Sequence, residues 1–189
     1  DGIDLCFEAP VNENREALAA AVAQAHARGL RVMIVPHLWV ESGEWRALID
    51  PGTDEGWQRW SESYRSFLLY WATLAASSNV DLLSIGVELR SWVTTTRVES
   101  MLPIIDEVRS VYPGLLTYSS NWDDAELSMV WGAVDVIGIN AFYPLADHDG
   151  ASASELAAGG FRVAADLERF ANEQRKPIVE ALVAHAEDA

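Results

Sequence analysis

The sequence predicts an α/β protein with a parallel sheet, of the kind that closes into a (β/α)8 TIM barrel. Short apolar runs alternate with helical stretches, and polar residues stand where the apolar runs end. A doubly wound open sheet is the alternative. It would usually carry a glycine-rich phosphate loop after an early strand, and none follows residues 2–8 or 31–38.

The predicted strands are short aliphatic runs, and the predicted helices have apolar residues at helical spacing. The strands cover 2–8, 31–38, 80–89, 114–122, 134–143 and 176–182. The helices cover 14–30, 56–76, 98–112, 125–133 and 153–175. We expect Gly29 to end the first helix and Pro103 to lie in the first turn of the third. Gly159 and Gly160 are expected to break the last helix.

Composition limits the size of the protein and the class of its partners. The chain has 189 residues, half of them hydrophobic, which fits one domain over residues 1–189. A net charge of -16 argues against nucleic acid and anionic membranes as partners. The single cysteine, Cys6, excludes an internal disulfide. Because the opening "DGIDLCFEAP" has no initiator methionine, the chain looks cut at its start, and both a secreted and a cytoplasmic address stay open.

Polar side chains at the carboxyl ends of the predicted strands form the candidate site. His37, Glu88 and Asn121 each end a strand, and Asn140 and Tyr143 end a fourth. In barrel enzymes the active site lies at this end of the sheet. These residues are therefore expected to face one cleft.

The strand "VDLLSIGVEL" carries the most informative of these residues. A period of two places Ile85 and Val87 toward the helices, and Ser84, Gly86 and Glu88 toward the barrel axis. The same alternation in "VDVIGIN" turns its final asparagine inward.

An acid at the end of an inner strand is partly desolvated. Desolvation would raise the pKa of Glu88 and let it serve as a general acid. The alternative is a structural ion pair between Glu88 and Arg90 or Arg46.

Four stretches together resemble glycoside hydrolase family 113. They are "GLRVMIVPHLWVESGEWRALID", "LLSIGVEL", "LLTYSSNWD" and "VDVIGINAFYPL", and the match runs in order from about residue 14 to residue 145. The family consists of retaining β-mannanase-type (β/α)8 barrels with two catalytic glutamates. The resemblance implies that residues 2–8 are strand two and residues 176–182 are strand seven, so the barrel lacks strands one and eight.

The same resemblance implies catalytic roles. Glu88 matches the acid/base at the end of strand four, and the nucleophile should end strand seven. The family pattern places that glutamate about five residues after the strand-seven proline. Here Leu182 stands at that point, and the available acid is Glu180, three residues after Pro177. Retaining chemistry needs the two carboxyl groups about 5–5.5 Å apart.

Further residues are expected to contact sugar, with packing as the alternative for each. They are His37, Trp39, Trp45, Arg46, Trp92, Asn121, Trp122, Asn140 and Tyr143. Histidine and asparagine would hydrogen-bond hydroxyl groups, and tryptophan would stack on sugar faces. The resemblance implies that the tyrosine orients the nucleophile. The aromatic residues at helical spacing within 56–76 are instead predicted to pack that helix against the sheet.

The sequence and the resemblance together predict a retaining glycoside hydrolase that cleaves a β-linked polysaccharide or oligosaccharide, with β-mannan as the preferred substrate class. No cofactor or metal is expected. The alternative is a carbohydrate-binding barrel, or a gene fragment, that has lost its nucleophile. A properly placed second carboxylate would separate the enzyme from the binder.

Overall fold

A computed structural model describes residues 11–176 and contains one parallel sheet. Its strands are β1 (Met33–Ile34), β2 (Leu82–Val87), β3 (Leu115–Asn121) and β4 (Val136–Asn140). The sheet order is β1-β2-β3-β4, and every neighbouring pair is parallel. A doubly wound sheet would reverse this order at a switch point, whereas a barrel wall adds each strand beside the last. The observed order therefore agrees with one arc of a barrel.

The four strands lie within the ranges predicted for 31–38, 80–89, 114–122 and 134–143, and each is shorter than predicted. The predicted strands at 2–8 and 176–182 lie outside the described residues, apart from Lys176, which follows the last helix.

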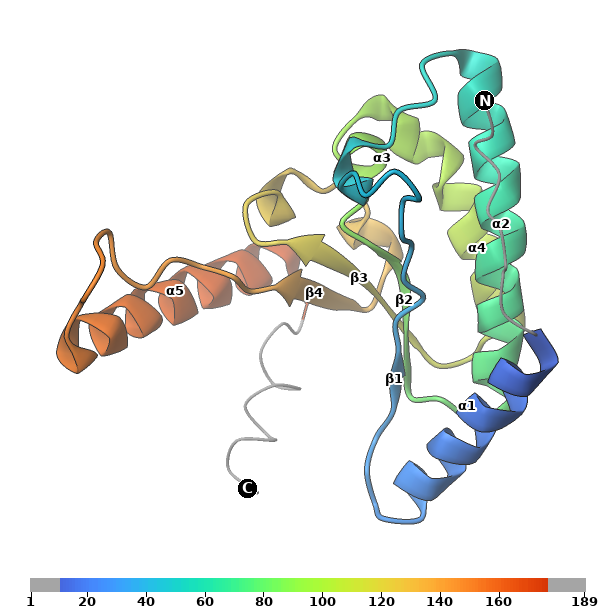
Figure 1. Ribbon diagram of the computed structural model, residues 1–189, viewed down its shortest axis with the longest axis horizontal. Coiled ribbons are helices and arrows are strands. Elements are labelled where there is room, and N and C mark those ends of the chain that lie inside the picture. Colours follow the sequence, from blue (N-terminus) through green and yellow to red (C-terminus); the bar gives the residue numbers. More distant parts are fainter. Residues whose placement is uncertain (1–10, 177–189) are drawn as a thin grey trace.

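Over residues 11–176, five α-helices and four short 3-10 turns flank or connect the strands. The helices are α1 (Val11–His26), α2 (Asp54–Ser77), α3 (Arg90–Val93), α4 (Leu102–Val111) and α5 (Ala153–Gln174). The turns are η1 (Arg46–Leu48), η2 (Thr96–Ser100), η3 (Ala125–Leu127) and η4 (Trp131–Ala133). Figure 1 shows α2 and α4 side by side against the sheet, while α5 extends beyond β4. No helix within residues 11–176 is long and apolar enough to cross a membrane.

Helix α2 forms because its start is capped and one of its faces is aromatic. The Thr53 side chain accepts a hydrogen bond from the Gly56 amide at 3.0 Å, and acidic residues occupy the first turn. The buried aromatic face consists of Trp57, Trp60, Tyr64 and Phe67. The predicted packing role of these residues is confirmed. The aromatic face of α2 packs against β2.

Two of the predicted helices differ from the structure in kind or continuity, and the one predicted over 98–112 begins only at Leu102, after η2. Pro103 lies in the first turn of α4, as expected. The stretch 125–133 forms two 3-10 turns, η3 and η4, instead of one helix. Helix α5 runs unbroken through Gly159 and Gly160, so the predicted break is wrong.

Packing explains one of the two glycines in α5. A Cβ atom at position 159 would lie 1.9 Å from the Leu145 carbonyl oxygen, so only glycine allows the loop after β4 to contact the helix there. A capping box between Ser152 and Glu155 stabilises the start of α5. The capping box helps to offset a propensity penalty of about 1 kcal/mol for each glycine in the helix.

Two aspartates fix the strand register at the amino end of the sheet. Asp81 precedes β2 and accepts the Val32 amide at 2.7 Å beside the start of β1. Asp135 precedes β4 and accepts the Leu116 amide at 2.8 Å in β3. Each carboxylate thus binds the main chain of the neighbouring strand, which aligns the two strands.

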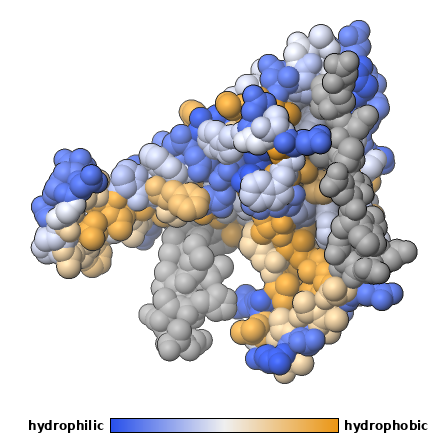
Figure 2. Space-filling model, in the orientation of Figure 1, coloured by the Kyte–Doolittle hydropathy of each residue, from blue (hydrophilic) through white to orange (hydrophobic). Residues whose placement is uncertain are grey.

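Apolar side chains in and beside β1 remain partly exposed. Met33 and Val35 are 43% and 36% exposed, and Leu30 is 55% exposed. Figure 2 shows hydrophobic surface over the region of β1 and α1, and hydrophilic surface toward α3 and the upper end of α2. The polar end of the molecule is the end at which the carboxyl ends of the strands lie.

Candidate active site

Glu88 follows β2 directly and is held in an unusual backbone conformation. Its φ angle is 50°, in the left-handed region that non-glycine residues rarely adopt. Its amide donates to the Ser119 carbonyl at 2.9 Å, and only 7% of the residue is exposed. Strained backbone of this kind is concentrated at functional sites.

An irregularity in β2 changes which residues face the site. The register with β3 shifts between Ser84 and Val87, so that two residues of β2 face one of β3. A Cβ atom on Gly86 would lie 3.0 Å from the Tyr64 hydroxyl of α2. Gly86 therefore faces the helices, and its predicted inward orientation is wrong. The shift and the left-handed turn, rather than simple alternation, determine where Glu88 points.

Two buried tyrosines hold this irregular segment in place. The Tyr64 hydroxyl donates to the Ile85 carbonyl at 2.9 Å. The Tyr118 hydroxyl accepts the Leu89 amide at 2.6 Å. The backbone on both sides of Glu88 is thus bonded to side chains of α2 and β3, which stabilises the strained turn.

Three side chains from two separate parts of the chain donate to the Glu88 carboxylate. Oε2 accepts the Trp45 indole N–H and an Arg46 guanidinium N–H, both at 2.9 Å. Oε1 accepts the Asn140 amide N–H at 2.7 Å. Trp45 and Arg46 lie between β1 and α2, and Asn140 ends β4. The structure thus brings together four of the residues predicted for the site.

These donors determine the ionisation of Glu88. Burial raises its pKa, but the hydrogen bonds from Trp45 and Asn140 and the charges of Arg46 and His37 outweigh burial. The pKa of Glu88 therefore lies below its ordinary value, and the predicted rise is wrong. The prediction considered desolvation alone, because the donors come from residues far from Glu88 in the sequence.

Glu88 forms an ion pair with one of the two arginines named from the sequence. Arg46 pairs with Glu88, and the side chains are 12% and 9% exposed. Arg90 instead pairs with Asp123 and Asp124, at 2.6 and 2.9 Å. The sequence alone could not choose between the two arginines.

Arg90 was not predicted as a functional residue, yet it contacts the site through Trp45. Its guanidinium carbon lies 5.0 Å from the centre of the Trp45 ring. Its position two residues after Glu88 was the only signal in the sequence.

His37 and Trp39 form a second aromatic surface beside Arg46. Their rings stack 5.5 Å apart with an interplanar angle of 12°, and Trp39 is 84% exposed. Arg46 lies 5.9 Å from the Trp39 ring centre. Partial burial and the charge of Arg46 lower the pKa of His37, and the Glu88 carboxylate acts in the opposite direction. Both rings lie in the loop after β1, since that strand ends at Ile34.

Trp92 is a core residue, so its predicted role as a sugar-stacking residue is wrong. It is 1% exposed, and its indole N–H donates to the Arg97 carbonyl and the Ser100 hydroxyl. Its ring meets that of Tyr64 edge to face at 5.1 Å. Helix α3 begins two residues after Glu88 and turns Trp92 toward α2.

The remaining predicted contacts lie beyond β3 and β4. Asn121 ends β3, and its amide donates to Asp123 at 2.6 Å. The rings of Trp122 and Tyr143 meet edge to face at 5.4 Å. Tyr143 lies in the loop after β4 rather than on the strand. The roles of these residues in sugar binding stay predictions.

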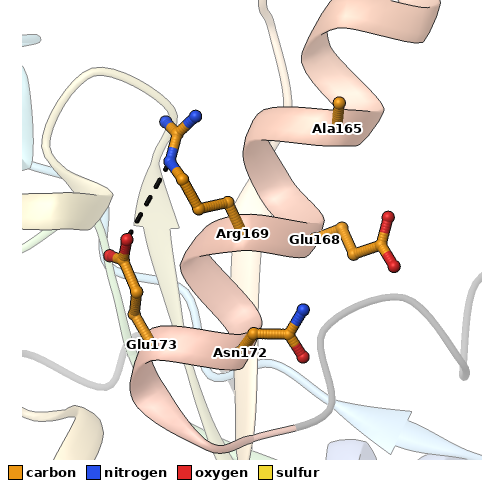
Figure 3. Close-up of a pocket in the computed structure, with 5 residues that line it drawn as sticks. All are labelled: Ala165, Glu168, Arg169, Asn172 and Glu173. Atoms are coloured by element: carbon orange, nitrogen blue, oxygen red, sulfur yellow. Dashed lines mark ion pairs between the residues drawn. The ribbon is translucent and has the colours of Figure 1, made fainter.

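A shallow hollow on α5 belongs to a different surface. It is lined by Ala165, Glu168, Arg169, Asn172 and Glu173 (Figure 3). All five residues come from one helix, and two of them form the ion pair marked in the figure. The hollow contains none of the predicted site residues.

Two further expectations concern metals and the nucleophile. Within residues 11–176, no group of three or more His, Cys, Asp and Glu side chains could hold a metal ion. Glu180, the predicted nucleophile, lies outside the described residues.

Comparison with solved structures finds mannanases. The chain superimposes on a GH113 β-1,4-mannanase with a TM-score of 0.71 and 25% identity. It matches the GH113 β-mannanase AaManA from Alicyclobacillus acidocaldarius, solved in complex with ManMIm, with a TM-score of 0.71 and 26% identity. Each match covers 87% of this chain and 50% of the other, so the chain spans half the length of these structures.

A more distant likeness extends to fungal β-1,4-galactanases, with a TM-score of 0.53 over 87% of this chain and 55% of the other. At 15% identity it shows the fold alone.

No curated protein matches the chain. The family model of Glycoside Hydrolase Family 113 matches residues 3–181, almost the whole sequence. The chain therefore belongs to glycoside hydrolase family 113.

Proposed function

We propose that this chain is part of a retaining glycoside hydrolase that acts on a β-linked polysaccharide, with β-1,4-mannan as the substrate class. The observation that carries the proposal is the setting of Glu88. A buried carboxylate ends a central strand and receives three hydrogen bonds from side chains of distant segments. Family membership and the likeness to β-1,4-mannanases support the substrate class.

In the proposed reaction, Glu88 protonates the glycosidic oxygen while a second carboxylate attacks the anomeric carbon. The bond to the leaving sugar breaks, and a glycosyl-enzyme ester forms. Glu88, now ionised, then takes a proton from water as the water attacks the same carbon. The ester breaks, and the sugar is released with its original configuration. We assign the second carboxylate to Glu180.

The lowered pKa of Glu88 suits the second of these steps. A base must be ionised, and the donors Trp45, Arg46 and Asn140 stabilise the ionised form. The first step needs a proton on Glu88. An ionised nucleophile about 5–5.5 Å away would favour this protonation, because a nearby negative charge raises the pKa of a carboxyl group such as that of Glu88.

The surrounding side chains are proposed to bind the sugar. Trp39 offers an exposed ring for stacking, and His37 lies against it with nitrogen atoms for a hydroxyl group. Asn121 and Trp122 would form a second contact beyond β3. Tyr143 would orient the nucleophile from the loop after β4.

A carbohydrate-binding barrel without a nucleophile is the second candidate. The ion pair between Arg46 and Glu88 favours it, because a paired carboxylate of lowered pKa can bind hydroxyl groups without donating a proton. The two functions differ in turnover. The enzyme releases reducing ends from β-mannan, whereas the binder retains the polysaccharide unchanged.

The test is the Glu88→Gln substitution in the full chain, assayed for release of reducing sugar from β-1,4-mannan. We expect a loss of about 10²–10⁴-fold in kcat, with binding of mannan oligosaccharides retained. Glu107→Gln is the matched control, since Glu107 also pairs with an arginine, Arg65, but lies on the surface. Unchanged activity in Glu88→Gln would overturn the role of Glu88. Binding without hydrolysis by the unmodified chain would favour the second candidate.

A further inference from the structure

Arg90 lies where three chain segments of the site meet. It is the first residue of α3, and its Nε and Nη2 atoms bond to Asp124 and Asp123 at 2.9 and 2.6 Å. The guanidinium carbon lies over the Trp45 ring, 5.0 Å from its centre. One side chain thus joins the turn after β2, the loop after β3 and the loop after β1.

The aspartate side of this contact is rigid. Asp124 is 1% exposed and also accepts a hydrogen bond from the Ser120 hydroxyl of β3. Asp123 accepts the Asn121 amide at 2.6 Å. The guanidinium group is therefore held in a fixed plane by two carboxylates, each of which has a second partner. Arginine can meet two carboxylates and stack on a ring at once, because its donors form a planar fork.

The other partner in this contact is the indole ring of Trp45. Trp45 is 37% exposed and lies in the long segment 35–53 between β1 and α2. Its indole N–H must point at Glu88 Oε2 for the 2.9 Å bond to form. A cation stacked on the ring stabilises one orientation of the indole by about 0.5–1 kcal/mol at exposed sites, and by more when it is desolvated.

We propose that Arg90 is a positioning residue that holds the Trp45 indole so that its N–H reaches the Glu88 carboxylate. The inference rests on the proposed function of Glu88. Arg90 touches neither Glu88 nor the reacting atoms. Its influence passes through the tryptophan.

The other charged groups around Glu88 act separately. Among the described residues, Arg46 and His37 face it from the loop after β1, and Tyr118 on β3 senses its charge. The Arg90 guanidinium instead contacts Asp123, Asp124 and the Trp45 ring. An effect of Arg90 on the titration of Glu88 should therefore disappear when the Trp45 N–H is removed.

The test is the titration of Glu88 by ¹³C NMR in the full chain with labelled glutamate, the signal being assigned with Glu88→Gln. Arg90→Lys keeps a positive charge beside buried Asp124 but removes the planar fork, so the fold is retained. Trp45→Phe keeps a ring but removes the N–H. We expect both substitutions to raise the pKa of Glu88, because each weakens a hydrogen bond to its ionised form. In the Trp45→Phe background, Arg90→Lys should add no further shift.

Arg97→Lys is the matched control. Arg97 also lies over a tryptophan, 5.6 Å from the Trp57 ring centre, and also pairs with an aspartate, Asp54. It should leave the titration of Glu88 unchanged. The inference is overturned if Arg90→Lys leaves the titration unchanged, if its shift persists in the Trp45→Phe background, or if Arg97→Lys produces the same shift.

Kinetics separate this inference from the proposed function. If Glu88 is the acid/base, Arg90→Lys should lower kcat/KM on β-mannan by about tenfold, mainly through kcat. The titration needs no turnover. A chain that hydrolyses nothing would overturn the proposed function, while the coupling between Arg90 and Trp45 at Glu88 would still be decided by NMR.

Discussion

The two ends of the sheet use carboxylates in opposite ways. At the amino end, Asp81 and Asp135 each accept a main-chain amide of the adjacent strand. At the carboxyl end, the donors that residues 11–176 supply to the Glu88 side chain are themselves side chains, those of Trp45, Arg46 and Asn140. A carboxylate that accepts main-chain amides aligns two strands. A carboxylate that accepts side-chain donors from distant segments does not align strands, and this arrangement is typical of an active site.

The two aspartates have similar sequence contexts and similar contacts, and Glu88 differs from both. "VDLL" and "VDVI" both place an aspartate before a strand, and each aspartate meets the preceding strand of the sheet. Glu88 follows its strand and lies in a left-handed turn. In parallel α/β barrels the amino end serves stability and the carboxyl end serves chemistry. The same division is expected here, and substitutions at each end can test it.

Apart from Glu88 itself, the largest effect is expected at Arg46. Arg46→Met should lower kcat by about 10²-fold and reduce the free energy of unfolding by about 3 kcal/mol, because it leaves Glu88 buried without its ion-pair partner. Kinetics on β-mannan and urea unfolding measure the two effects. The double variant Arg46→Met/Glu88→Gln should regain stability but not activity. A double variant no more stable than Arg46→Met would show that the pair is not the cause.

A substitution at the amino end should reverse this pattern. Asp135→Ala removes the acceptor of the Leu116 amide and the partner of Arg109, so unfolding should need about 1–2 kcal/mol less free energy. The kcat on β-mannan should stay within about twofold of the unmodified value. Urea unfolding and steady-state kinetics on one preparation provide the comparison. A loss of kcat without a loss of stability would contradict the assignment of stability to the amino end of the sheet and chemistry to the carboxyl end.

The features of the site that depend on local sequence could be predicted, and those that depend on distant residues could not. Strand-end position correctly placed Glu88 and Asn140 at one end of the sheet, since the end of a strand can be read from local pattern. The direction of the Glu88 pKa shift could not be predicted. It depends on Trp45 and Arg46, which lie about forty residues away in a loop without periodicity.

Local irregularities account for the other errors. The register shift in β2 reversed the orientation of Gly86, and the short helix α3 carried Trp92 into the core. Helix α5 stayed continuous because contact with Leu145 requires glycine at position 159. In each case a tertiary contact outweighed the local preference of the sequence.

A smaller effect is expected from pH at the amino end. The Val32 amide, helped by His26, holds the pKa of Asp81 below its ordinary value against partial desolvation. A lowered pKa in the folded state means that stability is present above the unfolded pKa, about 3.9, and is lost as pH falls through the folded value. Asp81→Asn should flatten the acid limb of stability below about pH 4 and lower stability at neutral pH. Urea unfolding across pH 2–6 measures this, and an unchanged slope would contradict it.

The smallest effect is expected at Glu107. Its pair with Arg65 is exposed, with side chains 41% and 47% accessible. Glu107→Gln should change the free energy of unfolding by less than about 1 kcal/mol and leave kcat unchanged. Both values come from the same unfolding and kinetic assays. A large effect on kcat would mean that loss of an arginine-paired carboxylate disturbs the site from any position.

The most direct test of Glu88 as the acid/base of a retaining enzyme is the anomeric configuration of the first product. Hydrolysis of a β-1,4-mannan oligosaccharide by the full chain, followed by ¹H NMR, reports it. We expect the β-anomer first, which then mutarotates, and no product from Glu88→Gln on the same time scale. An α-anomer formed first, or hydrolysis by Glu88→Gln at the unmodified rate, would contradict it.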